Sequence, residues 1–508
     1  MDRCRLSALF LCGFALLATS SPSAQVRPQE RPLEPHGHLD LRNWSERNKS
    51  HQLISRKSLG DAIAALATRR FETSIVSNAT RVNGDLLPPG GSAQAETQAE
   101  PFLAVNPENP LHLVAVYQES RFADGGARVL NHSVSFDGGQ AWTEGMLPQL
   151  TPISGGPWSR ASDPWVAFGP AGRVYFASLL INGPNGDNAI GVSVSTDGGL
   201  SWGAPVLVAR ASAEFNDKEA VIADTFPSSP HFGNVYVAWD VNRFDARNRV
   251  KKQILAVSRS TDGGATWNRF KKLHKNKFNL AAVPGVGPDG TVYVVWTHFT
   301  SPVAPLNPQV YFSRSEDGGR RWSQATPVVT MTSRDVEGIR AGEGLVSFAV
   351  SPINGDLFLA WMDNRWGATS QATLSYSRDR GATWSTPQRV SDGPDDAHAF
   401  TVSVAVNQRG DVGVSYYSLR NDPARASLVD CYLNISRDGG LSFEPGQRLT
   451  GQSFDLRFAS QTGEFFLGDY IGLVGTENGF RMLWIGTDLD SEINPSRKQP
   501  DVFTASVE

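Results

Sequence analysis

An eight-residue motif recurs six times in this chain of 508 residues. Each copy reads Ser-x-Asp-x-Gly-x-x-Trp, and the last copy ends in Phe instead of Trp. The aspartates of successive copies are separated by 60, 65, 55, 62 and 59 residues. Self-similarity at a nearly fixed period indicates a repeat architecture, in which one structural unit is built several times over. The six aspartates are Asp137, Asp197, Asp262, Asp317, Asp379 and Asp438.

Each copy of the motif has the chemistry of a tight hairpin turn. The aspartate can accept backbone N–H groups, and glycine supplies the positive φ that such a turn needs. The closing Trp or Phe begins the next strand and fills the space under the turn. Strands of alternating character precede the copies, for example at residues 254–258 and 310–313. We therefore expect the six aspartates to be structural.

A second repeated pattern lies upstream of each copy. It is an apolar strand, a turn rich in Gly, Pro or Asn, and a second apolar strand that ends in an aromatic residue. A seventh version follows the last motif at residues 466–472 and 480–484, and residues 502–507 could supply its third strand. Residues 75–508 number 434, and one seventh of that is 62, which matches the motif spacing.

These motifs resemble the Asp-box (BNR) repeats of sialidases and related β-propellers, over about residues 100–445. The resemblance implies an all-β fold, and together with the seven repeats we expect a β-propeller of seven four-stranded blades over residues 75–508. Residues 73–81 would supply the outer strand of the last blade and close the ring. The alternative is six blades with an irregular cap, because known sialidases of this family have six. In that family the boxes lie on the face away from the active site.

The beginning of the chain differs from the repeat region. Arg3 and Arg5 precede an apolar run at residues 6–18 and then small residues, which predicts a signal peptide at 1–24 and export to the periplasm or the extracellular space. Residues 25–74 form a polar linker, in which 58–70 could make a short helix. No later stretch is long and apolar enough for a membrane helix, so we expect no membrane span in the mature chain.

Charge and residue counts exclude several function classes. Lys and Arg number 47 against 51 Asp and Glu, which argues against a nucleic-acid-binding protein. Three cysteines cannot make a disulfide scaffold, and Cys431 alone would remain after signal cleavage. No zinc-ligand spacing or EF-hand loop is present, so we expect no cofactor, although a structural Ca²⁺ ion stays open. We expect a monomer.

Charged residues gather in the segments that enter the first strand of each repeat and in those that leave the second. In a propeller these segments share the face where ligands usually bind. Several guanidinium groups around one channel would suit an acidic sugar, because each can bind a carboxylate through two hydrogen bonds. Two of the arginines follow a Trp-x-Asp-x-Arg pattern, in which the Asp and the Arg could instead pair with each other and fix the loop. The candidates are Arg243, Arg365 and Arg420, with Arg340 in reserve.

The resemblance to sialidases also implies catalytic roles. Those enzymes use three arginines on the sugar carboxylate, an Asp as acid/base and a Tyr nucleophile assisted by a Glu. Tyr470 resembles the nucleophile in its placement, Asp163 is the candidate acid, and Glu219 is the candidate partner of Tyr470. The Phe-Arg-Ile-Pro motif that carries the first arginine of sialidases is absent. Tyr470 could instead be an aromatic lining residue, and the two carboxylates could satisfy backbone amides at strand starts.

The sequence thus predicts an exported, retaining glycoside hydrolase of the exo-α-sialidase type. Its partner would be a glycan or glycoconjugate that carries a terminal acidic sugar. The alternative is a non-catalytic Asp-box propeller that binds a glycan or a protein on its channel face, since fold alone does not separate the two. A third interpretation is an enzyme on another polysaccharide, with the arginines binding uronate or sulfate.

Overall fold

The computed structural model describes residues 77–87, 92–94, 96–182, 186–245, 250–274, 278–299, 308–332, 334–423, 427–487 and 499–508. The predicted signal peptide (1–24) and linker (25–74) lie outside these residues. All described residues belong to one compact unit. They form strands and three short 3₁₀ helices, at Pro152–Ser154, Pro170–Gly172 and Leu456–Phe458, so the all-β expectation is confirmed. Within these ranges no helix is long and apolar enough to cross a membrane.

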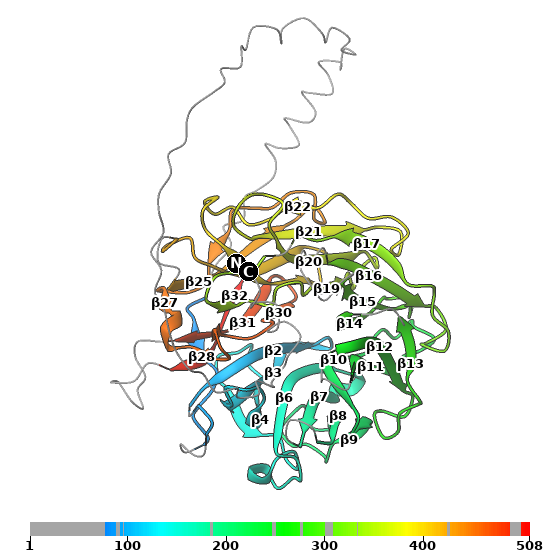
Figure 1. The fold of residues 1–508 in the computed structure, drawn as a ribbon. Helices are drawn as coiled ribbons and strands as arrows, with labels where there is room; N and C mark the ends of the chain where they lie inside the picture. The colour runs from blue at the N-terminus through cyan, green and yellow to red at the C-terminus, as the bar shows by residue number, and fades with distance from the viewer. Residues whose placement is uncertain are drawn as a thin grey trace, which may run out of the picture. The chain divides into compact units, whose positions relative to one another are not determined.

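Most strands belong to small antiparallel sheets, each built from strands that follow one another along the chain (Figure 1). The described residues in the first half of the chain form three such groups of strands. The first group is β2 (Gln98–Asn106), β3 (Asn109–Arg121), β4 (Ala127–Ser135) and β5 (Thr143–Met146), and the second is β6 (Arg160–Phe168), β7 (Val174–Ile181), β8 (Asn188–Ser195) and β9 (Val206–Ala211). The third group is β10 (Glu214–Ala223), β11 (Val235–Phe244), β12 (Val250–Ser260) and β13 (Lys271–His274). A single residue pair, Ala127 with Ala161, joins the first two of these groups into one larger sheet.

The second half repeats the arrangement. Its groups are β14 (Asn279–Val286), β15 (Val292–His298), β16 (Gln309–Ser315) and β17 (Thr326–Thr330); β19 (Ser347–Val350), β20 (Leu357–Asp363), β21 (Gln371–Ser377) and β22 (Gln388–Arg389); β23 (Ala399–Val406), β24 (Val412–Ser418), β25 (Leu428–Ser436) and β26 (Gln447–Arg448), with β27 (Phe454–Asp455) also on β25; and β30 (Gly472–Gly475), β31 (Phe480–Thr487), β32 (Pro500–Val507) and β1 (Thr80–Arg81).

The first strand of each group contacts the first strand of the next. These contacts run from β2 through β6, β10, β14, β19, β23 and β30, and then return to β2, so they form a closed cycle. The sheets are buried on both faces because neighbouring sheets pack against each other; β7, for example, is buried over its whole length. In six groups the second strand carries an aromatic residue that lies in these interfaces, fully or almost fully buried, and each of these strands continues past it: Tyr117, Trp239, Trp296, Trp361, Tyr416 and Trp484.

The Asp boxes form the turns after the third strands. In the second box, the Ser195 hydroxyl donates to Asp197 at 2.7 Å, and the Ser201 backbone N–H donates to the same Asp197 oxygen at 2.9 Å. Hydrogen bonds from the side chain and backbone of the residue four positions on lower the pKa of Asp197, Asp262 and Asp379 to about 2. The carboxylates are therefore fully used as acceptors within their own turns.

Each box also packs against the preceding sheet through its second glycine. A Cβ on Gly381 would lie 2.5 Å from the Phe312 ring, and one on Gly199 would lie 3.0 Å from Val114. The first glycine position is less restricted, because Arg380 occupies it in the fifth box and pairs with Asp289 of the preceding group. The box glycines thus set how closely neighbouring sheets approach.

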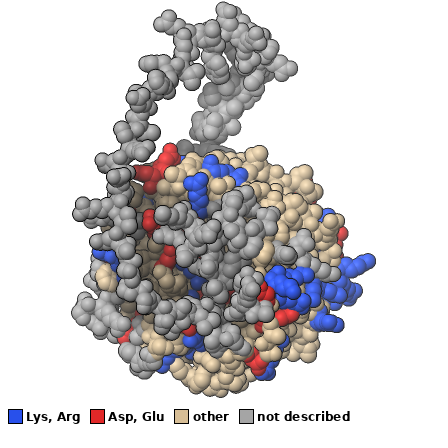
Figure 2. Space-filling model, in the orientation of Figure 1, with Lys and Arg blue, Asp and Glu red and all other residues tan. Residues whose placement is uncertain are grey.

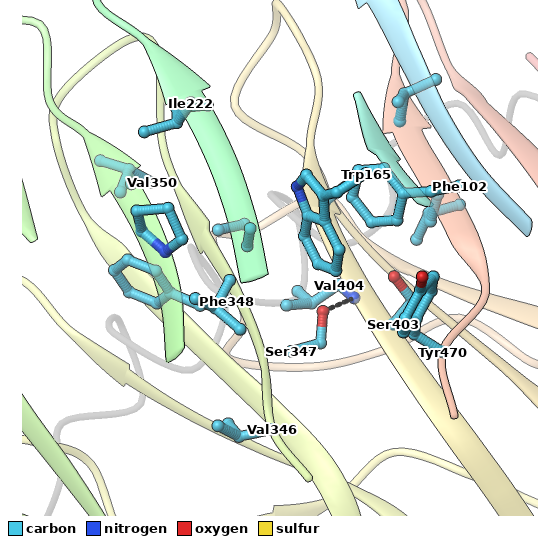
Figure 3. A pocket seen from close by; sticks show the side chains of 18 of the residues that line it. Phe102, Trp165, Ile222, Val346, Ser347, Phe348, Val350, Ser403, Val404 and Tyr470 are labelled. Carbon is cyan, nitrogen blue, oxygen red and sulfur yellow. Dashed lines mark hydrogen bonds between the residues drawn. The ribbon is translucent and has the colours of Figure 1, made fainter. Parts of the chain in front are cut away.

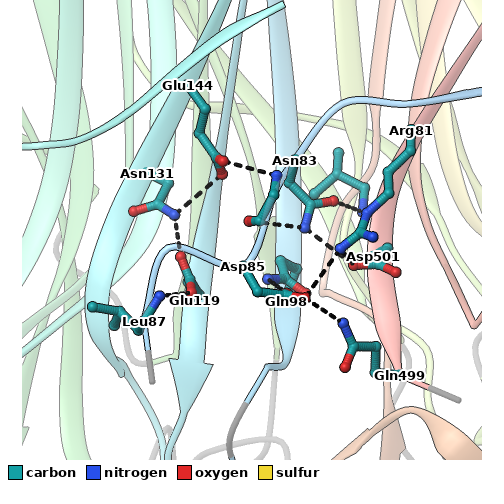
Figure 4. Close-up of polar contacts among 12 residues, drawn as sticks. Arg81, Asn83, Asp85, Leu87, Gln98, Glu119, Asn131, Glu144, Gln499 and Asp501 are labelled. Atoms are coloured by element: carbon teal, nitrogen blue, oxygen red, sulfur yellow. Dashed lines mark hydrogen bonds and ion pairs between the residues drawn. The ribbon is translucent and has the colours of Figure 1, made fainter. Parts of the chain in front are cut away.

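Both ends of the described chain meet in the last sheet. Strand β1 lies at its edge and pairs with β32, Thr80 opposite Thr504. In the segment that follows β1, Asn83 Oδ1 still accepts from the Val502 N–H of β32 at 2.7 Å. The segment then contacts the first group of strands, through the Gly84 N–H with Glu144 at 2.8 Å and the Leu87 N–H with Glu119 at 2.9 Å (Figure 4).

Charged side chains are not spread evenly over the surface. Figure 2 shows Lys and Arg gathered at the edge where Figure 1 labels β12 and β13. Lys251, Lys271 and Lys272 are exposed on these two outer strands. This basic edge is distinct from the first strands of the groups, whose side chains line the cavity described below.

Candidate active site in the central cavity

A cavity of about 370 Å³ lies among the first strands of the groups (Figure 3). Its walls are mostly apolar and include Val286, Phe348 and Val404. The charged side chains among its described lining residues are Asp163, Lys218, Glu219 and Asp469, with Tyr470 next to them in sequence. A mostly apolar cavity with a few convergent polar groups is the usual form of a small-molecule site.

Asp163, Lys218 and Glu219 come from a bulge that recurs in five of the first strands, whereas Asp469 and Tyr470 precede β30. At the bulge one residue takes a positive φ of about 50° and the pairing with the second strand is interrupted, as between Ala99 and Phe102 in β2. Non-glycine residues seldom adopt this conformation, and such strain is common at functional sites. The bulged residues are Glu100, Asp163, Lys218, Ala281 and Thr401.

The bulges and the Asp boxes lie at opposite ends of the sheets. The bulge of β2 begins beside Ala99, which pairs with Gln118 near the end of β3. The first box begins at Ser135, which pairs with Leu113 near the start of β3. The candidate site is therefore remote from the boxes.

The centre of the site is an ion-pair network around Asp469. Arg340 donates from Nε to Asp469 Oδ1 at 2.9 Å, and both Arg340 and Lys218 bind Oδ2. The Lys218 ammonium is also 3.7 Å from Glu100 and 3.8 Å from Asp163. Burial alone would raise the pKa of Asp469, but the two cations hold it well below its usual value. Asp469 is thus an ionised carboxylate with both oxygens engaged.

A small sheet outside the repeats positions Arg340. Strand β18 (Ile339–Arg340) pairs in parallel with β29 (Phe465–Phe466), which also pairs with β28 (Ser460–Gln461). The Arg340 guanidinium lies 4.7 Å from the centre of the Phe466 ring, and that of Arg121 lies 4.3 Å from it. This sheet links the segment before β19 to the segment before β30, so it fixes Arg340 beside Asp469.

Glu219 has the most unusual environment in the site. It is almost completely buried, and neither of its carboxyl oxygens has a hydrogen-bond partner among the described residues. Burial, and next the charge of Asp163, raise the pKa of Glu219 well above its usual value, so its environment favours the protonated form. Asp163 Oδ2 also lacks a partner among these residues. Unpartnered buried groups cost about 1–3 kcal/mol each and call for an explanation such as catalysis.

Further carboxyl groups surround this pair. Burial and the charge of Asp163 raise the pKa of Glu100 to about 8, and burial raises that of Asp240 to about 7. Burial also raises the pKa of Asp217 well above its usual value, and the charge of Asp240 adds to this. For each of these groups burial favours the protonated form, which limits the negative charge in the interior of the site.

Tyr470 stands beside an aromatic wall. Its hydroxyl donates to the Pro164 carbonyl at 2.9 Å, and its ring is edge-on to Trp165, with centres 5.3 Å apart. Trp165 stacks on Phe102 at 3.7 Å, and both line the cavity (Figure 3). Burial, followed by the charges of Glu100, Asp163, Glu219 and Asp469, raises the pKa of Tyr470 well above its usual value. The phenol is therefore neutral, and a base must take its proton if it is to react.

The structure brings together some of the predicted site residues and not others. Asp163, Glu219 and Tyr470 all line the cavity, and Arg340 reaches it through Asp469. Arg243, Arg365 and Arg420 are not among the described lining residues, because each pairs with a carboxylate near its own loop. The pairs are Arg243 with Glu214 at 2.6 Å, Arg365 with Asp363 at 2.8 Å and Arg420 with Asp392 at 3.0 Å.

Sequence reasoning did not select Glu100, Lys218 or Asp469 as candidates. A signal for Glu100 was present, because Glu100-Pro101-Phe102 repeats the acid-proline-aromatic order of Asp163-Pro164-Trp165. Both segments form the same bulge. This acid-proline-aromatic order could not have identified Lys218, since its strand has no proline at this point.

Within the described ranges, no set of three or more His, Cys, Asp or Glu side chains is placed to hold a metal ion. Cys431 is free and buried in β25.

The chain is similar to proteins that act on sugars. No family model matches the chain. A sialidase from Bacteroides fragilis (strain YCH46) is 25% identical over 286 residues, which are 51% of this chain and 49% of that protein. The chain therefore matches about half the length of this curated relative.

Similar solved structures include sialidases and an arabinanase. The Hadza microbial sialidase Hz136 has a TM-score of 0.44 and 15% identity, and the match covers 78% of this chain and 73% of that one. A mutant of NanB sialidase from Streptococcus pneumoniae has a TM-score of 0.41 and 13% identity, with 83% of this chain and 70% of that one covered. The Penicillium chrysogenum α-L-arabinanase complexed with arabinobiose has a TM-score of 0.45 and 14% identity, with 67% of this chain and 94% of that one covered. With its six Asp boxes, its closed cycle of small antiparallel sheets and its sialidase relative, the chain has a sialidase-like β-propeller fold.

Proposed function

We propose that this protein is a glycoside hydrolase that acts on a sugar bound in the central cavity, with Tyr470, Asp163 and Glu219 as its catalytic residues. The observation that carries the proposal is Glu219, a buried carboxyl group with both oxygens unpartnered among the described residues, beside Asp163 and Tyr470 at the wall of the cavity. A general acid needs such a proton-bearing group within reach of the substrate.

We also infer that the propeller has seven blades. The groups that begin with β2, β6, β10, β14, β19 and β23 would be six of them, and β30–β32 with β1 would be the seventh. The closed cycle of contacts among their first strands supports this count. Export through residues 1–24, to the periplasm or the extracellular space, remains a further prediction.

The environments of the two carboxyl groups suggest their roles. Protonated Glu219 would give its proton to the glycosidic oxygen as the bond to the anomeric carbon breaks. Tyr470 would attack that carbon, and its phenolic proton would pass to Asp163. Water would then displace Tyr470, giving one proton to Glu219, while the proton on Asp163 returns to Tyr470. Two displacements at one carbon retain its configuration.

This assignment exchanges the roles that the sequence suggested for Asp163 and Glu219. The reason is physical: burial favours the protonated form of Glu219, so Glu219 is a poor acceptor for the proton of Tyr470. Asp163 lies 3.8 Å from the Lys218 ammonium, and its Oδ2 has no hydrogen-bond partner among the described residues, which leaves that oxygen open to accept the proton.

The experiment compares leaving groups. Purified protein is assayed with aryl and alkyl glycosides of sialic acid, glucuronic acid, L-arabinofuranose and D-galactose. For a cleaved sugar, Glu219→Gln should lose about 10²–10⁴-fold in kcat/KM, which reports the first displacement, with the alkyl leaving group and far less with 4-nitrophenol, which needs no proton. Tyr470→Phe and Asp163→Asn should lose activity with both.

Two matched variants act as controls. Glu119→Gln changes another buried glutamate with a raised pKa, and Tyr416→Phe changes another buried tyrosine, and neither residue lines the cavity. Both should keep the wild-type rate. Equal loss with both leaving groups in Glu219→Gln would contradict its role. No turnover of any glycoside by well-folded wild type would favour the non-catalytic binding propeller.

A further inference from the structure

We propose that the cavity selects a neutral sugar, because Asp469 already occupies the cations to which the carboxylate of an acidic sugar would bind. This inference rests on the proposed function and names the substrate class of the same site. It departs from the acidic sugar that the sequence suggested.

The contacts of Asp469 are those expected of a bound carboxylate. A guanidinium fork suits the two oxygens of a carboxylate, and Arg340 binds Asp469 in this way through Nε and Nη2. Lys218 binds the same carboxylate from β10. The three residues come from distant parts of the chain, and the pairing of β18 with β29 fixes Arg340 in place. A substrate carboxylate could use these cations only by displacing Asp469.

The charges on the cavity wall also disfavour an anion. The described lining residues include one cation, Lys218, against the carboxyl groups Asp163, Glu219 and Asp469. Arg340 and Lys218, the two cations of the network, are already matched there by Asp469 and Asp163. The carboxylate of an acidic sugar would therefore enter a partly apolar cavity, where screening by water is weak, and would find among the described lining residues no cation without a carboxylate partner.

The same wall is suited to hydroxyl groups. Both oxygens of Glu219 and Oδ2 of Asp163 are buried at the cavity wall without hydrogen-bond partners among the described residues. A sugar hydroxyl that approached them would satisfy them, by donating to these oxygens or by accepting the proton of Glu219. Trp165 and Phe102 offer a flat apolar surface beside Tyr470, on which the C–H face of a sugar ring can pack. These features together describe a site for a polyhydroxylated, uncharged ring.

The first measurement uses the wild-type chain. Binding of the free sugars L-arabinose, D-galactose, N-acetylneuraminic acid and D-glucuronic acid is followed by ligand-observed NMR and calorimetry, alongside hydrolysis of their aryl glycosides. The inference predicts that a neutral sugar binds and its glycoside is cleaved, with acidic sugars weaker by about tenfold or more. Tighter binding and faster cleavage of an acidic sugar would overturn the inference and leave the proposed hydrolase intact.

The second measurement removes the internal carboxylate. Asp469→Asn keeps the shape of the side chain but releases Arg340 and Lys218, so the affinity for acidic sugars should rise by about tenfold or more relative to wild type. Asp363→Asn is the matched control, because Asp363 is a fully buried partner of Arg365 outside the cavity lining. That variant should leave the preference among sugars unchanged.

The remaining outcomes are decisive as well. An Asp469→Asn protein that folds but gains no affinity for acidic sugars would overturn the inference. If that variant does not fold, the wild-type preference alone decides. Binding of neutral sugars without cleavage would support the inference about the cavity and contradict the hydrolase. Binding of neither class of sugar would contradict both.

Discussion

Arg340 and Asp469 lie 129 positions apart in the chain, yet the guanidinium Nε donates to the carboxylate at 2.9 Å. They sit in the segments that lead into β19 and β30, and a third residue, Lys218 of β10, binds the same carboxylate. One carboxylate thus connects three separate parts of the fold at the point where their first strands surround the cavity.

Removing Arg340 should therefore weaken the whole fold. Arg340→Met should lower the free energy of unfolding by about 2 kcal/mol, below the typical cost of breaking a buried pair, because Lys218 still neutralises Asp469. Urea denaturation measures the change. Arg321→Met is the control, since Arg321 is 90% exposed in its pair with Asp317 and should have little effect. Equal effects of the two substitutions would show that the Asp469 network is not structural.

The second glycine of a box should tolerate alanine less well than a glycine of the same backbone conformation elsewhere. Gly381 and Gly233 share a φ of 83°, but an added Cβ meets Phe312 at the first and nothing within 4 Å at the second. Gly233→Ala should cost about 1–2 kcal/mol from backbone strain, and Gly381→Ala about 1–3 kcal/mol more.

A double-mutant cycle identifies the contact responsible. If the extra cost arises at the ring, Phe312→Leu should recover part of it in combination with Gly381→Ala. Indistinguishable midpoints of urea denaturation for the two alanine variants would rule out this packing role of the box glycine.

Glu119 should make stability depend on pH. Burial raises its pKa from 4.5 to about 7, so its contribution to stability is complete below pH 4.5 and is lost as the pH rises through 7. Glu119→Gln cannot ionise. Relative to wild type, the variant should therefore gain up to about 3 kcal/mol of unfolding free energy between pH 4.5 and pH 8. Denaturation at several pH values tests this, and a difference that does not change with pH would contradict it.

The rate of hydrolysis should have an alkaline limb set by Glu219. The acid form of this residue donates the proton, and burial holds its pKa well above the usual value, so activity should persist at neutral pH and fall as Glu219 ionises. In Glu219→Gln, the residual cleavage of a 4-nitrophenyl glycoside should lack that limb. The profile of kcat/KM against pH gives the result, and an unchanged alkaline limb in the variant would assign it to another group.

The repeat could be predicted from the sequence because it is local. Each box needs its Asp and glycine within a few residues, and six of the second strands carry an aromatic residue that fills the interface between sheets, as Trp296 does. The site is harder to predict, because its contacts join distant segments. The Trp-x-Asp-x-Arg pattern illustrates this: Arg365 closes its own loop on Asp363, whereas Arg243 turns instead to Glu214.

The pairing of β18 with β29 could not be predicted from the sequence either, because it also joins distant segments. Two residues on each strand leave no periodic pattern, and the partner segments are more than a hundred residues apart. Arg340 thus appeared only as a reserve candidate, although its position on this small sheet brings it to Asp469. Glu100 was within reach, since its acid-proline-aromatic sequence matches that of Asp163.

The closure of the last sheet by β1 has a consequence for how the protein is made. Strand β1 comes from the beginning of the described residues and β32 from their end. Asp163 and Tyr470 line the same cavity, but most of the repeats lie between them in the sequence. A nascent chain that still lacks its final strands can fold early sheets but cannot bring Tyr470 to Asp163. Catalytic competence would therefore arise late, only after β30–β32 have been synthesised and have joined β1 in one sheet.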